Sequence, residues 1–161
     1  MVPLDPVEFK WPYNGLIDNL RVAISGKANF LAALGLLVLT EILGRHILLA
    51  GRPSGTRPEV EDGEAFRVFF EEYMGQPAGT GKKVYGAFRS GFAHNLEFDK
   101  ADRSFVVMSP NPDFVAPGGF VPIDISPDGS IKKLDVNAYW RDWQQGLAKW
   151  ASERPDLILI R

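Results

Sequence analysis

Cysteine is absent from this sequence of 161 residues. Its absence excludes disulfide bonds, cysteine nucleophiles, and zinc or iron sites that depend on thiolate ligands. The two histidines, His46 and His94, form no cluster with metal-ligand spacing. We therefore expect no metal ion and no other cofactor. Because disulfides are typical of secreted chains, the composition favours a cytoplasmic protein.

A large excess of charge is also missing. The chain has 18 basic and 20 acidic side chains and a net charge of −2, which excludes a protein with a uniformly positive, nucleic-acid-coating surface. Binding of RNA would need a local basic patch, or two patches joined in a dimer. The first ten residues contain two prolines and two acidic residues where an export signal needs a basic start and a long apolar stretch. We expect no export signal.

No apolar run is long enough for a membrane span. The stretch 28–50 is apolar nearly all round, but its uncharged part ends at Thr40, and Glu41, Arg45 and His46 follow. A span needs about 18 or more apolar residues. The sequence therefore predicts a buried central helix over 28–50 and no membrane association.

A hydrophobic content of 45% suits a single domain over residues 1–161 with a substantial core. Three prolines among the first twelve residues disfavour a helix there. They predict an extended N-terminal arm over 1–13, which Phe9, Trp11 and Tyr13 would anchor to the body of the protein.

Apolar residues recur at helical spacing along most of the remaining chain. Helices are expected over 14–26, 28–50, 63–74, 80–94 and 135–152. Thr80 and Asp135 are candidate N-caps of the last two. A short strand at 105–108 and a β-hairpin at about 120–134 fall between these helices, because the sequence Ser-Pro-Asp-Gly favours a turn. The expected fold class is mainly α, a four-helix bundle with a β-hairpin inserted before the last helix.

The segment that is most informative for function is VYGAFRSGFAHN, residues 84–95, at the end of the expected fourth helix. It contains Arg89 and His94. Histidine exchanges protons near neutral pH, and the planar arginine side chain holds phosphate oxygens without losing its charge. The pair is therefore suited to phosphodiester chemistry.

This R-x-x-x-x-H pattern, preceded by an aromatic residue and a second apolar helix, resembles the HEPN superfamily of small prokaryotic helical proteins. The resemblance implies a HEPN-like bundle and a metal-independent endoribonuclease of a toxin–antitoxin or phage-defence type. Arg89 and His94 would be its catalytic residues, and Ser90 and Asn95 would orient them. It also implies a homodimer whose cleft takes single-stranded RNA. HEPN proteins without catalysis leave an alternative, a non-catalytic helical binding module or partner subunit of a defence or regulatory system.

The spacing of the pair raises a geometric question. Arg89 and His94 are about 140° apart around an ideal α-helix, so one straight helix cannot aim both at the same phosphate. A break at His94, or a second copy of the helix across a two-fold axis, would bring them together. Small residues of this helix, among them Gly86 and Gly91, leave room for such a copy.

A structural interpretation of the same pair stays open. In it, Arg89 pairs with Glu71 or Glu72, and His94 caps the C-terminus of its helix, where a positive side chain is favoured. The pair would then stabilise the fold and carry no chemistry.

Glu41 is a further candidate site residue, because a carboxylate within an apolar helix needs a partner or water. It either pairs with Arg45 one turn on, or, as the resemblance to HEPN-like proteins implies, it orients Arg89 or His94. The neighbouring His46 is most simply a packed structural histidine.

Two other motif matches are set aside. The sequence GTGKK at 79–83 resembles a phosphate loop, but it lacks the glycine spacing, the Ser or Thr and the preceding strand of that motif. Residues 124–135 place oxygen-bearing side chains at calcium-loop spacing, yet Pro127 and two lysines favour an ordinary turn.

Overall fold

The computed structural model describes residues 13–26, 28–50, 59–86, 105–108, 123–125 and 131–154. In chain order these residues form α1 Tyr13–Ser25, α2 Asn29–Leu49, α3 Asp62–Arg67, the π-helix η1 Val68–Tyr73, α4 Gly81–Val84, β1 Phe105–Met108, β2 Ile123–Ile125, β3 Ile131–Leu134 and α6 Val136–Glu153.

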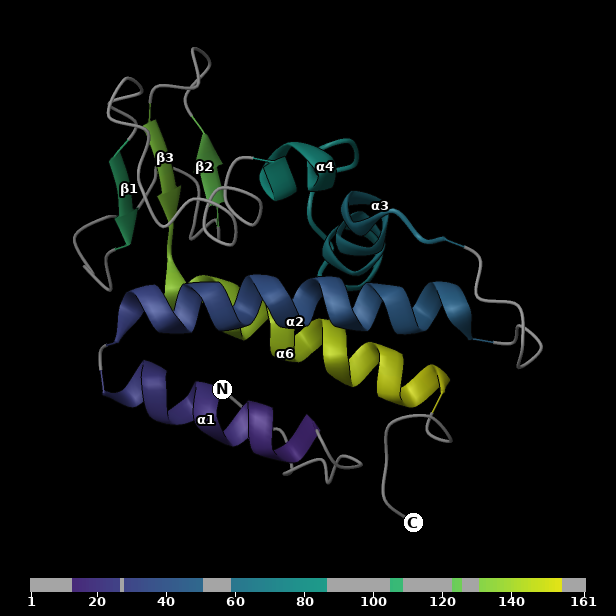
Figure 1. Ribbon diagram of the computed structural model, residues 1–161, viewed down its shortest axis with the longest axis horizontal. Helices are drawn as coiled ribbons and strands as arrows, with labels where there is room; N and C mark the ends of the chain where they lie inside the picture. The colour runs from purple at the N-terminus through teal and green to yellow at the C-terminus, as the bar shows by residue number, and fades with distance from the viewer. Residues whose placement is uncertain are drawn as a thin grey trace.

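Helix α2 is the central element of the helical part. α1 runs along one side of it, α3 packs on the other side, and α6 passes behind it (Figure 1). A large part of α2 is buried, including Ala32, Ala33, Leu36, Leu37, Leu39, Thr40 and Leu43. The prediction of a buried central helix is confirmed.

The composition of α2 would also allow a membrane span. Within the described ranges, Leu31–Leu49 is the one segment long and apolar enough to cross a membrane, and half of it is buried inside the structure. A core helix of a soluble protein meets the same criteria, so the expected lack of membrane association stays a prediction.

Aromatic side chains of α3, η1 and α6 fill the core beside α2. The ring of Phe66 stacks on that of Phe70 with centroids 5.3 Å apart, and Phe70 in turn lies 6.1 Å from Tyr139. Phe69 contacts Trp143 at a centroid distance of 6.1 Å. Large aromatic rings contribute much of the buried apolar area in a core. These contacts therefore join the middle of the chain to its last helix.

One buried polar contact links α2 to α6. The hydroxyl of Thr40 donates to the carbonyl oxygen of Leu36 at 2.8 Å, and it lies 2.8 Å from the hydroxyl of Tyr139. Because the single hydroxyl proton of Thr40 is directed to Leu36, Tyr139 is the donor in the second bond. Burial raises the pKa of Tyr139, which keeps this hydroxyl protonated.

A glycine allows α2 and α3 to approach very closely. A Cβ atom placed on Gly44 would lie 1.6 Å from the carbonyl oxygen of Ala65. No side chain can occupy that space, so the two backbones touch directly. Ala65 itself is fully buried at this crossing.

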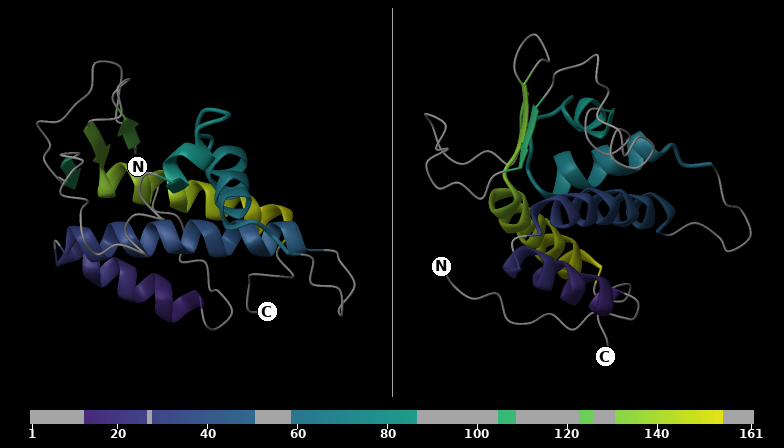
Figure 2. Two further views of the ribbon diagram at one scale, coloured as in Figure 1. Left: turned by 45° about the horizontal axis from the view of Figure 1, so that its top comes forward. Right: turned by 60° about the vertical axis from the view of Figure 1, so that its left-hand side comes forward.

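The described strands form one sheet in the order β1-β3-β2. Strands β1 and β3 are parallel, with Phe105 opposite Ile131, and strands β2 and β3 are antiparallel, with Ile123 opposite Leu134. The sheet stands to one side of the helices, at the beginning of α6 (Figures 1 and 2).

Strand β3 leads directly into α6. Leu134 is buried, and the carboxylate of Asp135 accepts a hydrogen bond from the Ala138 amide at 2.9 Å. Such a bond satisfies one of the free amides at a helix start. The predicted N-cap of the last helix is confirmed.

The expected fold class is wrong. Among the described elements, α1, α2 and α6 have 13, 21 and 18 residues, whereas α3, η1 and α4 have six, six and four. A bundle of four long helices is not formed there. Strand β3 also pairs with β1, so no isolated hairpin is inserted; the strands make a mixed sheet. The parallel pair escaped prediction because it joins residues 105–108 to 131–134, and local periodicity does not report distant pairing.

Replacing Gly44 with alanine should strongly destabilise the protein. The added methyl group would collide with the Ala65 carbonyl, and overpacking of this kind typically costs about 1–3 kcal/mol and occasionally more. Urea unfolding of Gly44→Ala should show this loss in the free energy of unfolding. Gly15→Ala is the matched control, because a Cβ at Gly15 meets no atom within 4 Å and alanine suits a helix better. Equal stability of both variants would contradict the proposed contact.

Candidate functional site

The predicted catalytic residues Arg89, Ser90, His94 and Asn95 all lie outside the described residues, so the geometry that joins them stays a prediction. The structure does describe Glu41 and the beginning of the helix that leads toward Arg89. The candidate site is therefore built from this helix start and from the groups that hold it.

The start of α4 is held in place by a buried carboxylate. Glu71 of η1, whose side chain is 8% exposed, accepts a hydrogen bond from the Gly81 amide at 2.7 Å. A negative group is favoured at the N-terminus of a helix. Close packing adds to this, since a Cβ on Gly81 would lie 2.7 Å from the Cα of Arg67. The chain therefore enters α4 at a defined position on α3 and η1.

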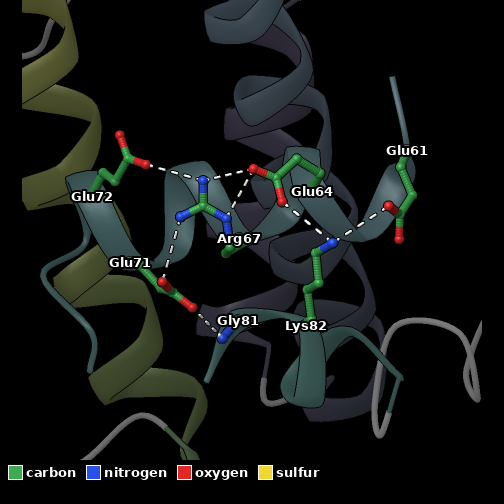
Figure 3. Close-up of polar contacts among 7 residues, drawn as sticks. All are labelled: Glu61, Glu64, Arg67, Glu71, Glu72, Gly81 and Lys82. Atoms are coloured by element: carbon green, nitrogen blue, oxygen red, sulfur yellow. Dashed lines mark hydrogen bonds and ion pairs between the residues drawn. The ribbon is translucent and has the colours of Figure 1, made fainter. Parts of the chain in front are cut away.

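Arg67 is the centre of the polar network behind α4 (Figure 3). Its Nη2 lies 2.7 Å from Oε1 of Glu64 and 3.2 Å from Oε1 of Glu72, and its Nη1 lies 3.5 Å from Oε2 of Glu71. The hydrogen bond from Arg67 lowers the pKa of Glu64, and the bond to Glu64 raises the pKa of Arg67. Glu64 and Arg67 therefore stay charged near neutral pH.

Lys82 extends this network onto α4. Its Nζ lies 3.4 Å from Oε2 of Glu61 and 3.5 Å from Oε2 of Glu64. Even so, acidic groups are in excess here, since residues 59–86 contain six acidic and three basic side chains. The surroundings of the α4 start are negative in charge.

The helix changes its winding just before the predicted motif. Gly81–Val84 is α-helical, and Tyr85 and Gly86 are wound as a π-helix. Gly86 is exposed, and a Cβ placed on it would meet no atom within 4 Å. The small side of this helix is therefore open at Gly86.

Glu41 takes part in an ion-pair group of its own. Its Oε1 lies 3.4 Å from Nη2 of Arg45, and Arg45 also pairs with Asp62 and donates to the carbonyl oxygen of Val60 at 3.1 Å. The helix pair with Arg45 is thus present, and the bonds from Arg45 to Val60 and Asp62 fasten the start of α3 to α2. A role of Glu41 in orienting Arg89 or His94 stays a prediction.

His46 lies at the surface rather than in the core. Partial loss of hydration and the positive charge of Arg45 lower its pKa below 6.5. The ring is therefore neutral at pH 7. Its interpretation as a packed histidine is wrong, because the side chain is exposed.

The structure bears in part on two kinds of site that the sequence argued against, a phosphate site at 79–83 and a metal site. The Gly81 amide, which a phosphate loop would direct to phosphate, is occupied by Glu71. Within the described ranges, no three His, Asp or Glu side chains are grouped so that they could hold a metal ion.

Sequence reasoning missed the Arg67 network. The ion pairs of Arg67 with Glu64 and Glu71 could have been predicted from the sequence. Glu64 stands three residues before Arg67 and Glu71 four residues after it, at the spacing of ion pairs on one helix face. The bond from Glu71 to Gly81 had no such signal, since it crosses the loop between two elements.

Comparison of the chain with family models, with curated proteins and with solved structures finds no match.

Glu71 and Glu72, both in η1, should differ in how much they contribute to the stability of the fold. Glu71→Leu removes the acceptor of the Gly81 amide and one partner of Arg67, which should cost about 1–3 kcal/mol of unfolding free energy. Glu72→Leu is the control, because Glu72 also pairs with Arg67 but is 55% exposed, and exposed pairs contribute about 0–1 kcal/mol. Chemical denaturation measures the free energy of unfolding of both variants. A larger loss for Glu72→Leu than for Glu71→Leu would contradict the prediction.

Protonation of His46 should destabilise the fold in mild acid. Its folded-state pKa lies below the ordinary 6.5, so the unfolded chain takes up the proton first as the pH falls. The free energy of unfolding should therefore decrease from about pH 7 toward pH 5, and His46→Gln should make this decrease smaller. Thermal melts across this range test it. An unchanged slope in the variant would show that His46 does not contribute.

Proposed function

We propose that the chain is a metal-independent endoribonuclease that cleaves single-stranded RNA with Arg89 and His94. The observation that carries this proposal is the π-helical winding at Tyr85 and Gly86. In a π-helix the backbone bonds join residues five apart, so residues five apart share a face as residues four apart do in an α-helix. Winding of this kind through the motif would aim Arg89 and His94 at one phosphate. Such turns are frequent at functional sites.

The chemistry would follow from the two side chains. The 2′-hydroxyl attacks the adjacent phosphorus, and the bond from phosphorus to the 5′-oxygen breaks, which leaves a 2′,3′-cyclic phosphate and a 5′-hydroxyl. His94 either takes the proton of the 2′-hydroxyl as general base or gives a proton to the leaving 5′-oxygen as general acid, with water exchanging the other proton. Arg89 binds the phosphate and the charge that develops on it. Ser90 and Asn95 would orient the pair. Toxin–antitoxin and phage-defence systems are the settings in which such an enzyme would act.

A homodimer is part of this proposal. The exposed Gly86, with open space around it, supports the approach of a second helix along the small side of the motif helix. A two-fold axis there would place the Arg89 and His94 of both protomers in one cleft.

A second function is favoured by the charges near the site. The acidic excess in residues 59–86 would repel the phosphates of RNA, whose binding depends on neutralisation by basic groups. A non-catalytic binding module, the partner subunit of another protein, has no such difficulty. In this case the motif pair would be structural.

The dimer should depend on Gly86. Light scattering at micromolar concentration should give about twice the chain mass of 17.9 kDa, and Gly86→Trp should lower the measured mass toward one chain by filling the space for the second helix. Gly15→Trp is the control, because Gly15 on α1 is equally open. A monomeric wild type at high concentration would rule out the dimer.

Cleavage should require both motif residues. His94→Ala and Arg89→Ala should each reduce the cleavage of single-stranded RNA in EDTA by about 100-fold or more, and their melting temperatures should stay close to that of the wild type. If the variants unfold, or if the wild type leaves a broad panel of RNAs intact, the pair is structural. The binding-module function then replaces the nuclease.

A further inference from the structure

The loop 75–80, which leads from η1 into α4, is bonded to a side chain of α6. Nε2 of Gln76 donates to Oδ2 of Asp142 at 3.0 Å and to the carbonyl oxygen of Met74 at 3.2 Å. The backbone amide of Gln76 also donates to the carbonyl oxygen of Phe70 at 3.2 Å. Most of the other residues of this loop are exposed. Gln76 is therefore the point at which α6 holds the loop.

Asp142 is a nearly buried carboxylate, and both of its oxygens accept hydrogen bonds. Its side chain is 12% exposed, Oδ2 accepts from Gln76, and Oδ1 accepts from Nε of the neighbouring Arg141 at 2.8 Å. A carboxylate loses hydration when it is buried, and apolar side chains of similar volume often stabilise a fold as well as buried charged groups do. The carboxylate at this position is thus better explained by the geometry that it imposes on the loop than by stability.

We infer that Asp142 is a positioning residue, which sets the direction of α4 through its bond to Gln76. Where it concerns the reaction, this inference rests on the proposed function, because α4 leads toward Arg89 and His94. Asp142 would then affect the rate through α4 and not by contact with RNA.

Glycines on both sides of Gln76 make the path of the loop depend on this bond. Gly75 and Gly79 have φ angles of 70° and 79°, in the left-handed region that glycine adopts readily. A Cβ placed on either glycine would meet no atom within 4 Å, so close packing does not fix these two turns. The bond between Gln76 and Asp142 fixes the chain between them.

A small change in the direction of α4 would be enlarged along the helix. Arg89 follows Gly81 by eight residues, and a helix of that length, which the sequence predicts here, extends about 12 Å. A tilt of about 10° at Gly81 would displace its far end by about 2 Å. A misplacement of about 1 Å at a reacting group can lower a rate about 100-fold. Loss of the bond should therefore lower kcat more than it changes KM.

Reversal of the hydrogen bond gives a direct test. Gln76→Glu brings two carboxylates together and removes the bond, and the further change Asp142→Asn restores a bond, because the amide introduced at 142 donates to the carboxylate introduced at 76. In the cleavage of single-stranded RNA, Gln76→Glu should lower kcat about tenfold or more and change KM by less than about twofold. The double variant should recover most of kcat.

Gln145→Ala is the matched control, because Gln145 is exposed on α6, and it should leave kcat unchanged. An unchanged kcat in Gln76→Glu overturns the inference. A loss of kcat that the double variant does not recover also overturns it.

Hydrogen exchange separates this inference from the proposed function, because it needs no cleavage of RNA. Peptides that cover residues 81–86 should exchange about tenfold faster in Gln76→Glu than in the wild type, and the double variant should restore slow exchange. Peptides of α2 should exchange at the same rate in all variants. If the wild type cleaves no RNA, the ribonuclease proposal fails, and exchange alone decides whether Asp142 positions α4. Equal exchange at 81–86, or faster exchange in α2 as well, overturns the inference.

Discussion

The direct contact between the backbones of α2 and α3 is the constraint on which the rest of the described structure depends. Gly44 has no side chain, so the carbonyl group of Ala65 can lie against α2. This close approach sets how far α3, and the π-helix η1 that continues it, lie from α2. Phe69 and Phe70 can then reach across to Trp143 and Tyr139 of α6. Any residue larger than glycine at position 44 would separate the two layers and open the core.

The same placement decides where the polar side of α3 and η1 lies. The apolar rings point to the core, and Arg67 lies on the outer side with Glu64, Glu71 and Glu72 around it. Glu71 then reaches the Gly81 amide. The chain that leads to Arg89 and His94 thus starts from a position fixed by packing, a charged network and one hydrogen bond. A site that depends on a precise meeting of two side chains needs support of this kind.

The charges around this start also limit the function. A ribonuclease must hold a polyanion, yet the neighbouring glutamates outnumber the basic residues. Arg67 and Lys82 are engaged with these glutamates, so they have little charge to offer RNA. Productive binding would therefore need other basic groups, from a local patch or from two patches joined in a dimer, and the binding module has no such requirement.

The sequence by itself determined the features that depend on neighbours along the chain. The apolar run of α2, the helical spacing of α6 and the N-cap Asp135 were all predicted, because residues three or four apart report helix formation directly. Only the tertiary structure decided which elements touch. The parallel pairing of β1 with β3, the crossing at Gly44 and the bond from Glu71 to Gly81 join segments that no local period connects. Their formation depends on packing in three dimensions, and that information is spread over the whole chain.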